Sequence, residues 1–233
     1  MLKRESPLFV ELWKKGGICM TIITLTNVPD GIVIAADSRL SKITGNGLSF
    51  LSDNMEKIHN INNFGLAFHG DSDYRGKSIL DIIKDFKKEI NFQDTINDVE
   101  FKLKKFMQLN YIEMNTDFWL AGYKLNEQFV YHIFNNKLNW ISERVNIGEK
   151  KFCSYQGGNV DLVRKLNEII TPDFEKMNLE KAIKFSEYYV ETTIKGLEFN
   201  NQYSNCGGPI DILVIKSDNI YFQRHKRYIS SPI

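Results

Sequence analysis

A threonine and an acidic residue are spaced so that they could form the nucleophilic site of a hydrolase. Thr21 opens the segment TIITLTNVPDGIVIAADSR, in which two alternating apolar runs flank a Pro-Asp-Gly turn. This pattern is typical of a β-hairpin, so Asp37, at the end of the second run, is expected to return beside Thr21. A threonine hydroxyl is a poor nucleophile until a general base takes its proton.

The nearest base available to Thr21 is the α-amine that it would own if the chain began there. Such an amine has a pKa of about 7.7 to 8.0, so a useful fraction is unprotonated near neutral pH. Met20 precedes Thr21, so removal of an initiator methionine or of a leader would expose the amine. We therefore expect residues 1–20 to be a propeptide or a misassigned upstream segment, and residues 21–233 to form one domain.

Several segments in order resemble the proteasome β-subunit and HslV peptidase group of N-terminal nucleophile (Ntn) hydrolases. The likeness runs from Thr21 through GIVIAADSR to MEKIHNI, and resumes at FHGDSD, at a Gly-Gly pair before a helix and at NCGGPIDILVI. It covers roughly residues 21 to 224. The resemblance implies that Thr21 is the nucleophile, that Asp37 supports it, and that the backbone N–H of Gly70 binds the oxyanion.

The fold expected from the periodicity is α+β. Strands, two helices, strands, two helices and strands follow one another, as in a four-layer αββα sandwich of two antiparallel sheets between helix pairs. Strands are expected within 22–38, 57–61, 64–69, 118–123, 128–134, 138–142, 210–215 and 220–223. Helical stripes cover 79–90 and 99–107, and two further helices are expected after caps at Asn159 and Asn178.

One position departs from the family in a way that bears directly on catalysis. The family pairs its acid with a lysine, and a gapless count from Thr21 places Asp53 at the lysine position. A carboxylate cannot supply the positive potential that favours an alkoxide. Lys57 is expected about 13 Å further along the strand, too far to replace the lysine. Asp53 is thus expected to face Asp37, and Asp53→Lys to raise hydrolytic activity.

Other supporting positions are also altered. Arg39 is retained, two residues after the acid. Gly157 stands where the family has a serine in its Gly-Ser-Gly turn, Tyr203 where it has an acid, and Cys206 where it has a late serine. Cys206 is expected to pack as a small apolar residue.

Composition limits the partners. The net charge is +1 with 25% charged residues, which gives no basic field for nucleic acid. The three cysteines are too few and scattered for a disulfide scaffold or a zinc site, so a reducing, cytoplasmic location is expected. No apolar run reaches the length of a membrane span. The histidines lack ligand spacing, and neither a metal nor a cofactor is expected.

Two functions remain compatible with the sequence. The first is an N-terminal-threonine hydrolase that cleaves peptide or amide bonds. The second is a catalytically inactive proteasome-like subunit that keeps the fold and assembles. Both imply a homo-oligomeric ring or stacked assembly by the family's example, whereas the sequence does not define the ring size, the substrate or any ATPase partner.

Overall fold

The computed structural model of the chain describes residues 18–19, 21–44, 47–199 and 204–225. Its strands are β1 (Ile18–Cys19), β2 (Ile22–Val28), β3 (Gly31–Ala36), β4 (Leu40–Thr44), β5 (Gly47–Ser52), β6 (Ile58–Ile61), β7 (Phe64–Asp71), β8 (Asp73–Tyr74), β9 (Lys77–Ser78), β10 (Thr116–Lys124), β11 (Glu127–Asn135), β12 (Trp140–Arg144), β13 (Cys153–Gly158), β14 (Asp211–Ile215) and β15 (Ile220–Arg224). Its helices are α2 (Ile79–Lys88), α3 (Ile96–Asn110), α4 (Asp161–Ile169), α5 (Leu179–Glu198) and the 3₁₀ turn η1 (Gly148–Lys150).

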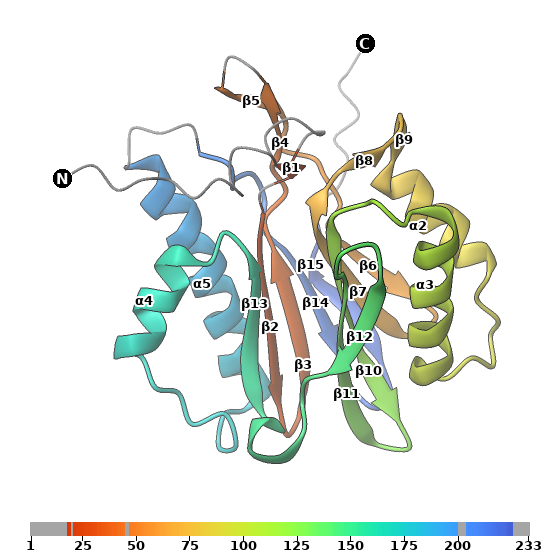
Figure 1. The fold of residues 1–233 in the computed structure, drawn as a ribbon. Coiled ribbons are helices and arrows are strands. Elements are labelled where there is room, and N and C mark those ends of the chain that lie inside the picture. The colour runs from red at the N-terminus through yellow and green to blue at the C-terminus, as the bar shows by residue number, and fades with distance from the viewer. Residues whose placement is uncertain (1–17, 20, 45–46, 200–203, 226–233) are drawn as a thin grey trace, which may run out of the picture.

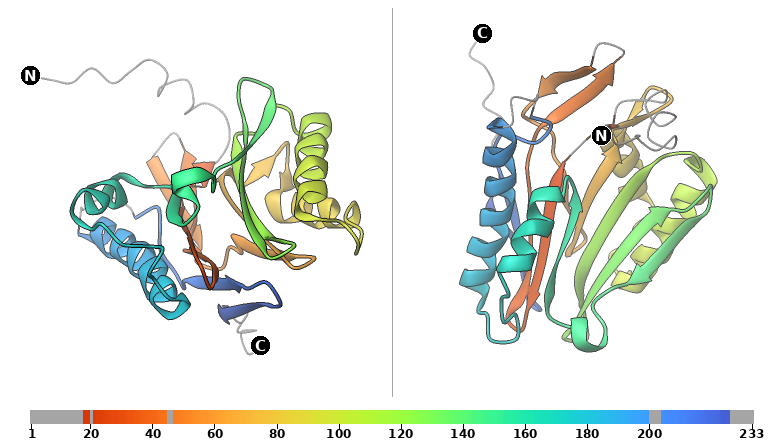
Figure 2. Two further views of the ribbon diagram at one scale, coloured as in Figure 1. Left: turned by 90° about the horizontal axis from the view of Figure 1, so that it is seen from below. Right: turned by 60° about the vertical axis from the view of Figure 1, so that its left-hand side comes forward.

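Two antiparallel sheets form the centre of the molecule (Figure 1). The first sheet has the order β1-β7-β10-β11-β12, with β6 paired to the same edge of β7 as β1. The second sheet has the order β13-β2-β3-β14-β15. Helices α2 and α3 cover the outer face of the first sheet, and α4 and α5 cover that of the second (Figure 2). The expected α+β, four-layer αββα architecture is confirmed.

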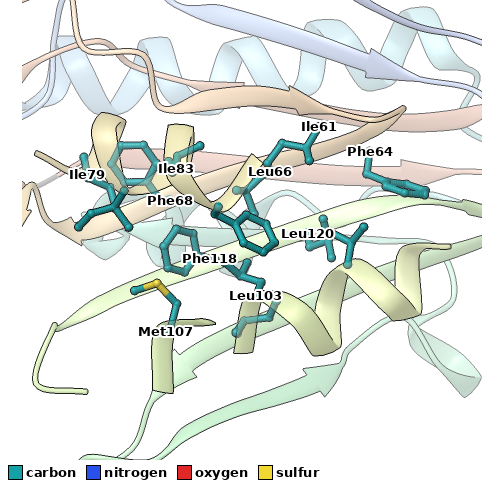
Figure 3. Packing of buried hydrophobic residues seen from close by; sticks show 14 of the residues in the cluster. Ile61, Phe64, Leu66, Phe68, Ile79, Ile83, Leu103, Met107, Phe118 and Leu120 are labelled. Carbon is teal, nitrogen blue, oxygen red and sulfur yellow. The ribbon is translucent and has the colours of Figure 1, made fainter. Parts of the chain in front are cut away.

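Strand periodicity decides which layer each side chain joins. In β2, Ile23 and Leu25 point between the sheets, while Ile22 packs toward α5. In β7, Leu66 and Phe68 join the cluster under α2 and α3 (Figure 3). Successive side chains of a strand face opposite sides, so each sheet contributes to two apolar layers.

All three hydrophobic clusters are built, as far as the chain is described, from residues at or after Ile22. The segment that precedes Thr21 adds only the two-residue strand β1 to the described structure. A chain that begins at Thr21 therefore retains all of the described core, and we expect it to fold.

Of the two helix caps expected from the sequence, one is confirmed and one is wrong. Asn178 does cap α5, where its side chain accepts a hydrogen bond from Lys181 N. The cap expected at Asn159 is wrong, because α4 begins at Asp161 after Val160, which makes no side-chain cap bond. Phe101, placed in the apolar stripe of α3, is exposed instead.

Several strands of the structure are not predicted by the sequence pattern. Residues 40–52 form the hairpin β4–β5, which projects from one end of the sandwich (Figure 1). β13 pairs with β2 and completes the edge of the second sheet. The strand expected at 138–142 lies two residues later, as β12. Within the described residues, no helix is long and apolar enough to cross a membrane.

Candidate active site

The hairpin β2–β3 brings Thr21 beside Asp37, as the sequence predicts. Its register pairs Ile23 with Ala36, so the residues just outside this pair also meet. Asp37 N donates to Ile22 O at 3.3 Å. Thr21 Oγ1 donates to Asp37 Oδ1 at 2.6 Å, and both residues are buried. The expected pairing of hydroxyl and acid is thus present in the geometry.

Asp37 is the centre of a converging set of donors. Its carboxylate accepts at least five hydrogen bonds, all from residues that the structure describes. Oδ1 accepts from Thr21 Oγ1 at 2.6 Å, Ile22 N at 3.0 Å and Lys57 Nζ at 2.8 Å, and Oδ2 accepts from Gly207 N at 2.9 Å and Arg39 N at 3.2 Å. A buried charge needs this number of partners, since an unpaired one costs several kcal/mol.

Lys57, not Asp53, is the charge partner of Asp37. The two side chains form a salt bridge of 2.8 Å, and each has 0% of its surface exposed. The expectation that Lys57 lies too far away is therefore wrong. It assumed one straight strand from residue 53 to 57, whereas β5 ends at Ser52 and residues 53–57 bend away from strand geometry. Met55 N donates to Ser38 O at 2.9 Å, which holds this bend against the end of the hairpin.

Asp53 forms a pair with Arg39. Arg39 Nε lies 2.8 Å from Asp53 Oδ1 and its Nη2 lies 3.0 Å from Oδ2, the two-point geometry of a guanidinium on a carboxylate. The bond to Asp53 raises the pKa of Arg39. Arg39 Nη1 also donates to Ser204 O at 3.2 Å. Arg39 and Asp53 thus clamp the segment around residue 204, and the expectation that Asp53 faces Asp37 in the lysine's place is wrong.

The backbone of Thr21 is held by Gly158 and Asn159, a contact that the sequence pattern does not predict. Asn159 N donates to Thr21 O at 2.6 Å. The Asn159 side chain donates to Asn205 Oδ1 at 3.0 Å. Gly158 has φ +87°, and a Cβ there would lie 1.8 Å from Thr21 O, so only glycine fits. The signal in the sequence is the Gly-Gly-Asn run, whose two glycines end β13 and whose asparagine follows it.

The remaining altered positions take different places. Gly157 lies in β13 opposite Ile23, next to the rings of His69 and Trp119. Cys206 is completely buried in the cluster beneath α4 and α5, as an apolar residue would be. Tyr203 lies outside the described residues.

Gly70 lies in β7 with φ +114°, a conformation that favours glycine. A Cβ at Gly70 would lie 2.3 Å from Asn115 O. The next residue, Asp71, accepts a hydrogen bond from Asn115 N at 2.8 Å, and burial raises the pKa of its carboxyl to about 6. These contacts fix the backbone around Gly70.

β1 runs along β7 next to Gly70. Cys19 pairs with Gly70 and Ile18 with Asp71 in an antiparallel register. The chain that leads to Thr21 therefore follows the edge of β7 that bears Gly70. An extended peptide could use this same edge by adding a strand to the sheet.

Comparison with known proteins identifies the fold. No protein-family model matches the chain, and no curated protein matches it. Among solved structures, a mutant of Anbu from Hyphomicrobium sp. strain MC1 matches with a TM-score of 0.60 and 15% identity, over 91% of this chain and 88% of the Anbu chain. This chain therefore has the proteasome-like fold of Anbu.

The buried pair of Lys57 and Asp37 predicts a large effect on stability. Lys57→Met should lower the free energy of unfolding by about 3–5 kcal/mol, because it leaves the Asp37 carboxylate buried without a counter-ion. Adding Asp37→Asn should recover part of this loss. Urea unfolding measures both. Lys77→Met is the control, since its pair with Asp85 is partly exposed and should contribute less than about 1 kcal/mol. Equal losses for the two lysine variants would contradict the prediction.

Because Asp53 pairs with Arg39, we expect Asp53→Lys to destabilise the protein and not to raise hydrolytic activity. The substitution places a second cation against Arg39 and removes its two-point partner. It should lower the free energy of unfolding by about 1–2 kcal/mol rather than restore a catalytic lysine. Asp161→Lys on α4 is the matched control, because the Asp161 side chain is 89% exposed. A stabilised Asp53→Lys protein would count against this account of the pair.

Proposed function

We propose that the chain, after removal of residues 1–20, is an N-terminal-threonine hydrolase that cleaves peptide or amide bonds. The observation that carries the proposal is the buried series Thr21, Asp37 and Lys57, joined by contacts of 2.6 Å and 2.8 Å. A hydroxyl, an acid and an ammonium group in contact are the groups that an activated threonine requires. The proteasome-like Ntn-hydrolase fold is consistent with this chemistry, although fold alone does not establish it.

Each group has a distinct part in activating the nucleophile. Asp37 orients the Thr21 hydroxyl and holds Lys57 in place. The Lys57 ammonium contributes positive potential close to Oγ1, which favours negative charge on that oxygen. The α-amine of Thr21 is the general base, and it exists only when the peptide bond to Met20 has been broken. Thr21 has 0% of its surface exposed in the full-length chain, which agrees with a need for processing before substrates bind.

The reaction proceeds in two halves. Thr21 Oγ1 adds to the substrate carbonyl carbon while its proton passes to the α-amine. The C–N bond of the tetrahedral intermediate then breaks, and the leaving amine takes that proton, so an ester on Thr21 remains. Water adds to the ester carbon and gives a proton to the α-amine. The C–O bond to Thr21 breaks, Oγ1 regains the proton, and the acid product leaves.

The backbone N–H of Gly70 is the proposed donor to the oxyanion that forms in both halves. A fixed N–H stabilises developing charge because no reorganisation is needed during the reaction. The contacts of Gly70 and Asp71 with Asn115 supply that rigidity.

A catalytically inactive structural subunit is the alternative function. Its main support in the sequence was the absence of a lysine beside the family's acid. Because Lys57 contacts Asp37, that support is lost. The hydrolase is therefore the function that the site favours.

We also place the hydrolase in the cytoplasm. Cys153 and Cys206 form no disulfide, as expected in a reducing compartment. The location itself can be tested by fractionating host cells.

The nucleophile is tested by varying Thr21 in a chain that begins at this residue. Thr21→Ala should abolish turnover of small fluorogenic peptides, because no other group supplies the attacking oxygen, whereas Thr21→Ser should keep a measurable part of it. Circular dichroism should show an unchanged fold for both. Full activity in Thr21→Ala, or in native protein whose mass shows that residues 1–20 are retained, would refute the N-terminal mechanism.

We propose that the chain assembles into a homo-oligomeric ring or stacked rings. Exposed apolar side chains on the outer helices, Phe101 and Leu109 on α3 and Tyr188 on α5, are of the kind that subunit contact covers. Light scattering at micromolar concentration should give a mass several times that of one 27.1 kDa chain. Replacing Phe101 and Leu109 by Ser should reduce that mass. A monomeric wild-type protein would rule out the assembly.

A further inference from the structure

A group of ionisable and aromatic side chains lies on the inner face of the first sheet, beside Gly70. We call it the inner wall; its members are His69 on β7, Asp117 and Trp119 on β10, and His132 and Phe134 on β11. The face follows from alternation: Trp119 belongs to the cluster between the sheets, and Asp117 precedes it by two residues. His69 is the direct cross-strand partner of Asp117. The inner wall has no part in the mechanism proposed above.

Asp117 is the charged centre of the inner wall. Its Oδ2 lies 2.9 Å from His132 Nε2 and 3.8 Å from His69 Nε2. The His132 ring stacks between Trp119, at 4.4 Å between centroids, and Phe134, at 4.6 Å. The Asp117 side chain remains 29% exposed, so it can still accept a hydrogen bond from a ligand. Among the described residues, no group of three acids, histidines or cysteines is arranged to hold a metal ion.

Two nitrogens of the inner wall lie close to the backbone of Gly157 on β13. Trp119 Nε1 is buried and has no hydrogen-bond partner among the described residues. A Cβ on Gly157 would lie 2.6 Å from His69 Nε2 and 2.8 Å from Trp119 Nε1. The two rings therefore pack directly against the backbone of Gly157, and Trp119 Nε1 is a buried donor that lacks a partner among the described residues. Such donors usually bind water or ligand.

The register of β1 shows how a substrate would meet the inner wall. Cys19 lies opposite Gly70, so the next position of a peptide strand in this register lies opposite His69. Residues directly opposite in an antiparallel pair have side chains on the same face. This position is next to the one opposite Gly70, the proposed donor to the oxyanion. A substrate residue there would carry the carbonyl that Thr21 attacks, with its side chain directed to the inner wall.

The charges near that position favour a cation. Burial lowers the pKa of His69, so its imidazole is neutral at pH 8. The charge of Lys57 is balanced by Asp37. Glu143 on β12 lies opposite His132 and adds a second acid at the far side. Asp117 thus has no cationic lysine or arginine partner among the described contacts.

We propose that the inner wall binds a lysine or arginine side chain of the peptide substrate, at the residue that precedes the cleaved bond. Asp117 pairs with the cationic group, while Trp119 and Phe134 contact the aliphatic stem. The assignment rests on the proposed hydrolase function and gives it a substrate class.

Binding to a variant without the nucleophile tests the inner wall separately from turnover. The protein is the chain beginning at position 21 with Thr21→Ala. The probes are two fluorescein-labelled tripeptides, Leu-Leu-Arg and Leu-Leu-citrulline, which differ in charge but hardly in shape. By fluorescence polarisation at pH 8, the arginine peptide should bind at least about tenfold more tightly. Asp117→Asn should abolish this preference, whereas the exposed control Asp161→Asn should leave it unchanged.

Each outcome bears on one proposal. Equal binding of the two peptides, binding of neither, or a preference that survives Asp117→Asn in a folded protein overturns the inner-wall assignment. Turnover of the same two sequences, each extended by a fluorogenic amide after its third residue, by the chain with Thr21 intact reports on the hydrolase. Hydrolysis without preference for arginine removes only the inner-wall assignment. A charge-dependent binding preference without hydrolysis leaves the binding site in place and removes the hydrolase.

Discussion

The buried charge of Asp37 is the constraint on which the site depends. A carboxylate with no exposed surface is tolerated only when its oxygens are matched by donors, and these come from four separate parts of the chain: the start of β2, the end of β3, the segment before β6 and the loop before β14. Each part is therefore fixed relative to the others by the same residue. The four segments are therefore held most firmly at the site where the proposed chemistry takes place.

The two ion pairs of the site differ in kind. Lys57 and Asp37 are completely buried, so their contact excludes water and contributes potential at Thr21. Arg39 and Asp53 are partly exposed, with 22% and 34% of their side chains accessible, and they hold a loop. The sequence points to the wrong partner for Asp37 because acids and bases follow one another closely between residues 37 and 57. Composition gives the charges but not their partners.

The fold was more predictable than the site because periodicity is local and long. The alternation in β2 and β3 and the stripe in α2 fix layers without knowledge of distant contacts. The position of Lys57 cannot be predicted in this way. The hairpin β4–β5 and the bend after Ser52 interrupt the chain between Asp37 and Lys57, so their separation in sequence does not give their distance in space. Asparagine often caps a helix, but Asn159 instead binds Asn205 and the backbone of Thr21, contacts to distant residues that local pattern does not predict.

The neutral pair beside Thr21 has a consequence for maturation. Breaking the bond before Thr21 creates an amine next to a lysine and a carboxylate whose charges already cancel. An added ammonium group would raise the local charge to +1. The Lys57 ammonium nearby disfavours that added positive charge. Under the proposed function, breaking this bond would therefore produce an amine whose uncharged, reactive form is favoured by the same lysine that pairs with Asp37.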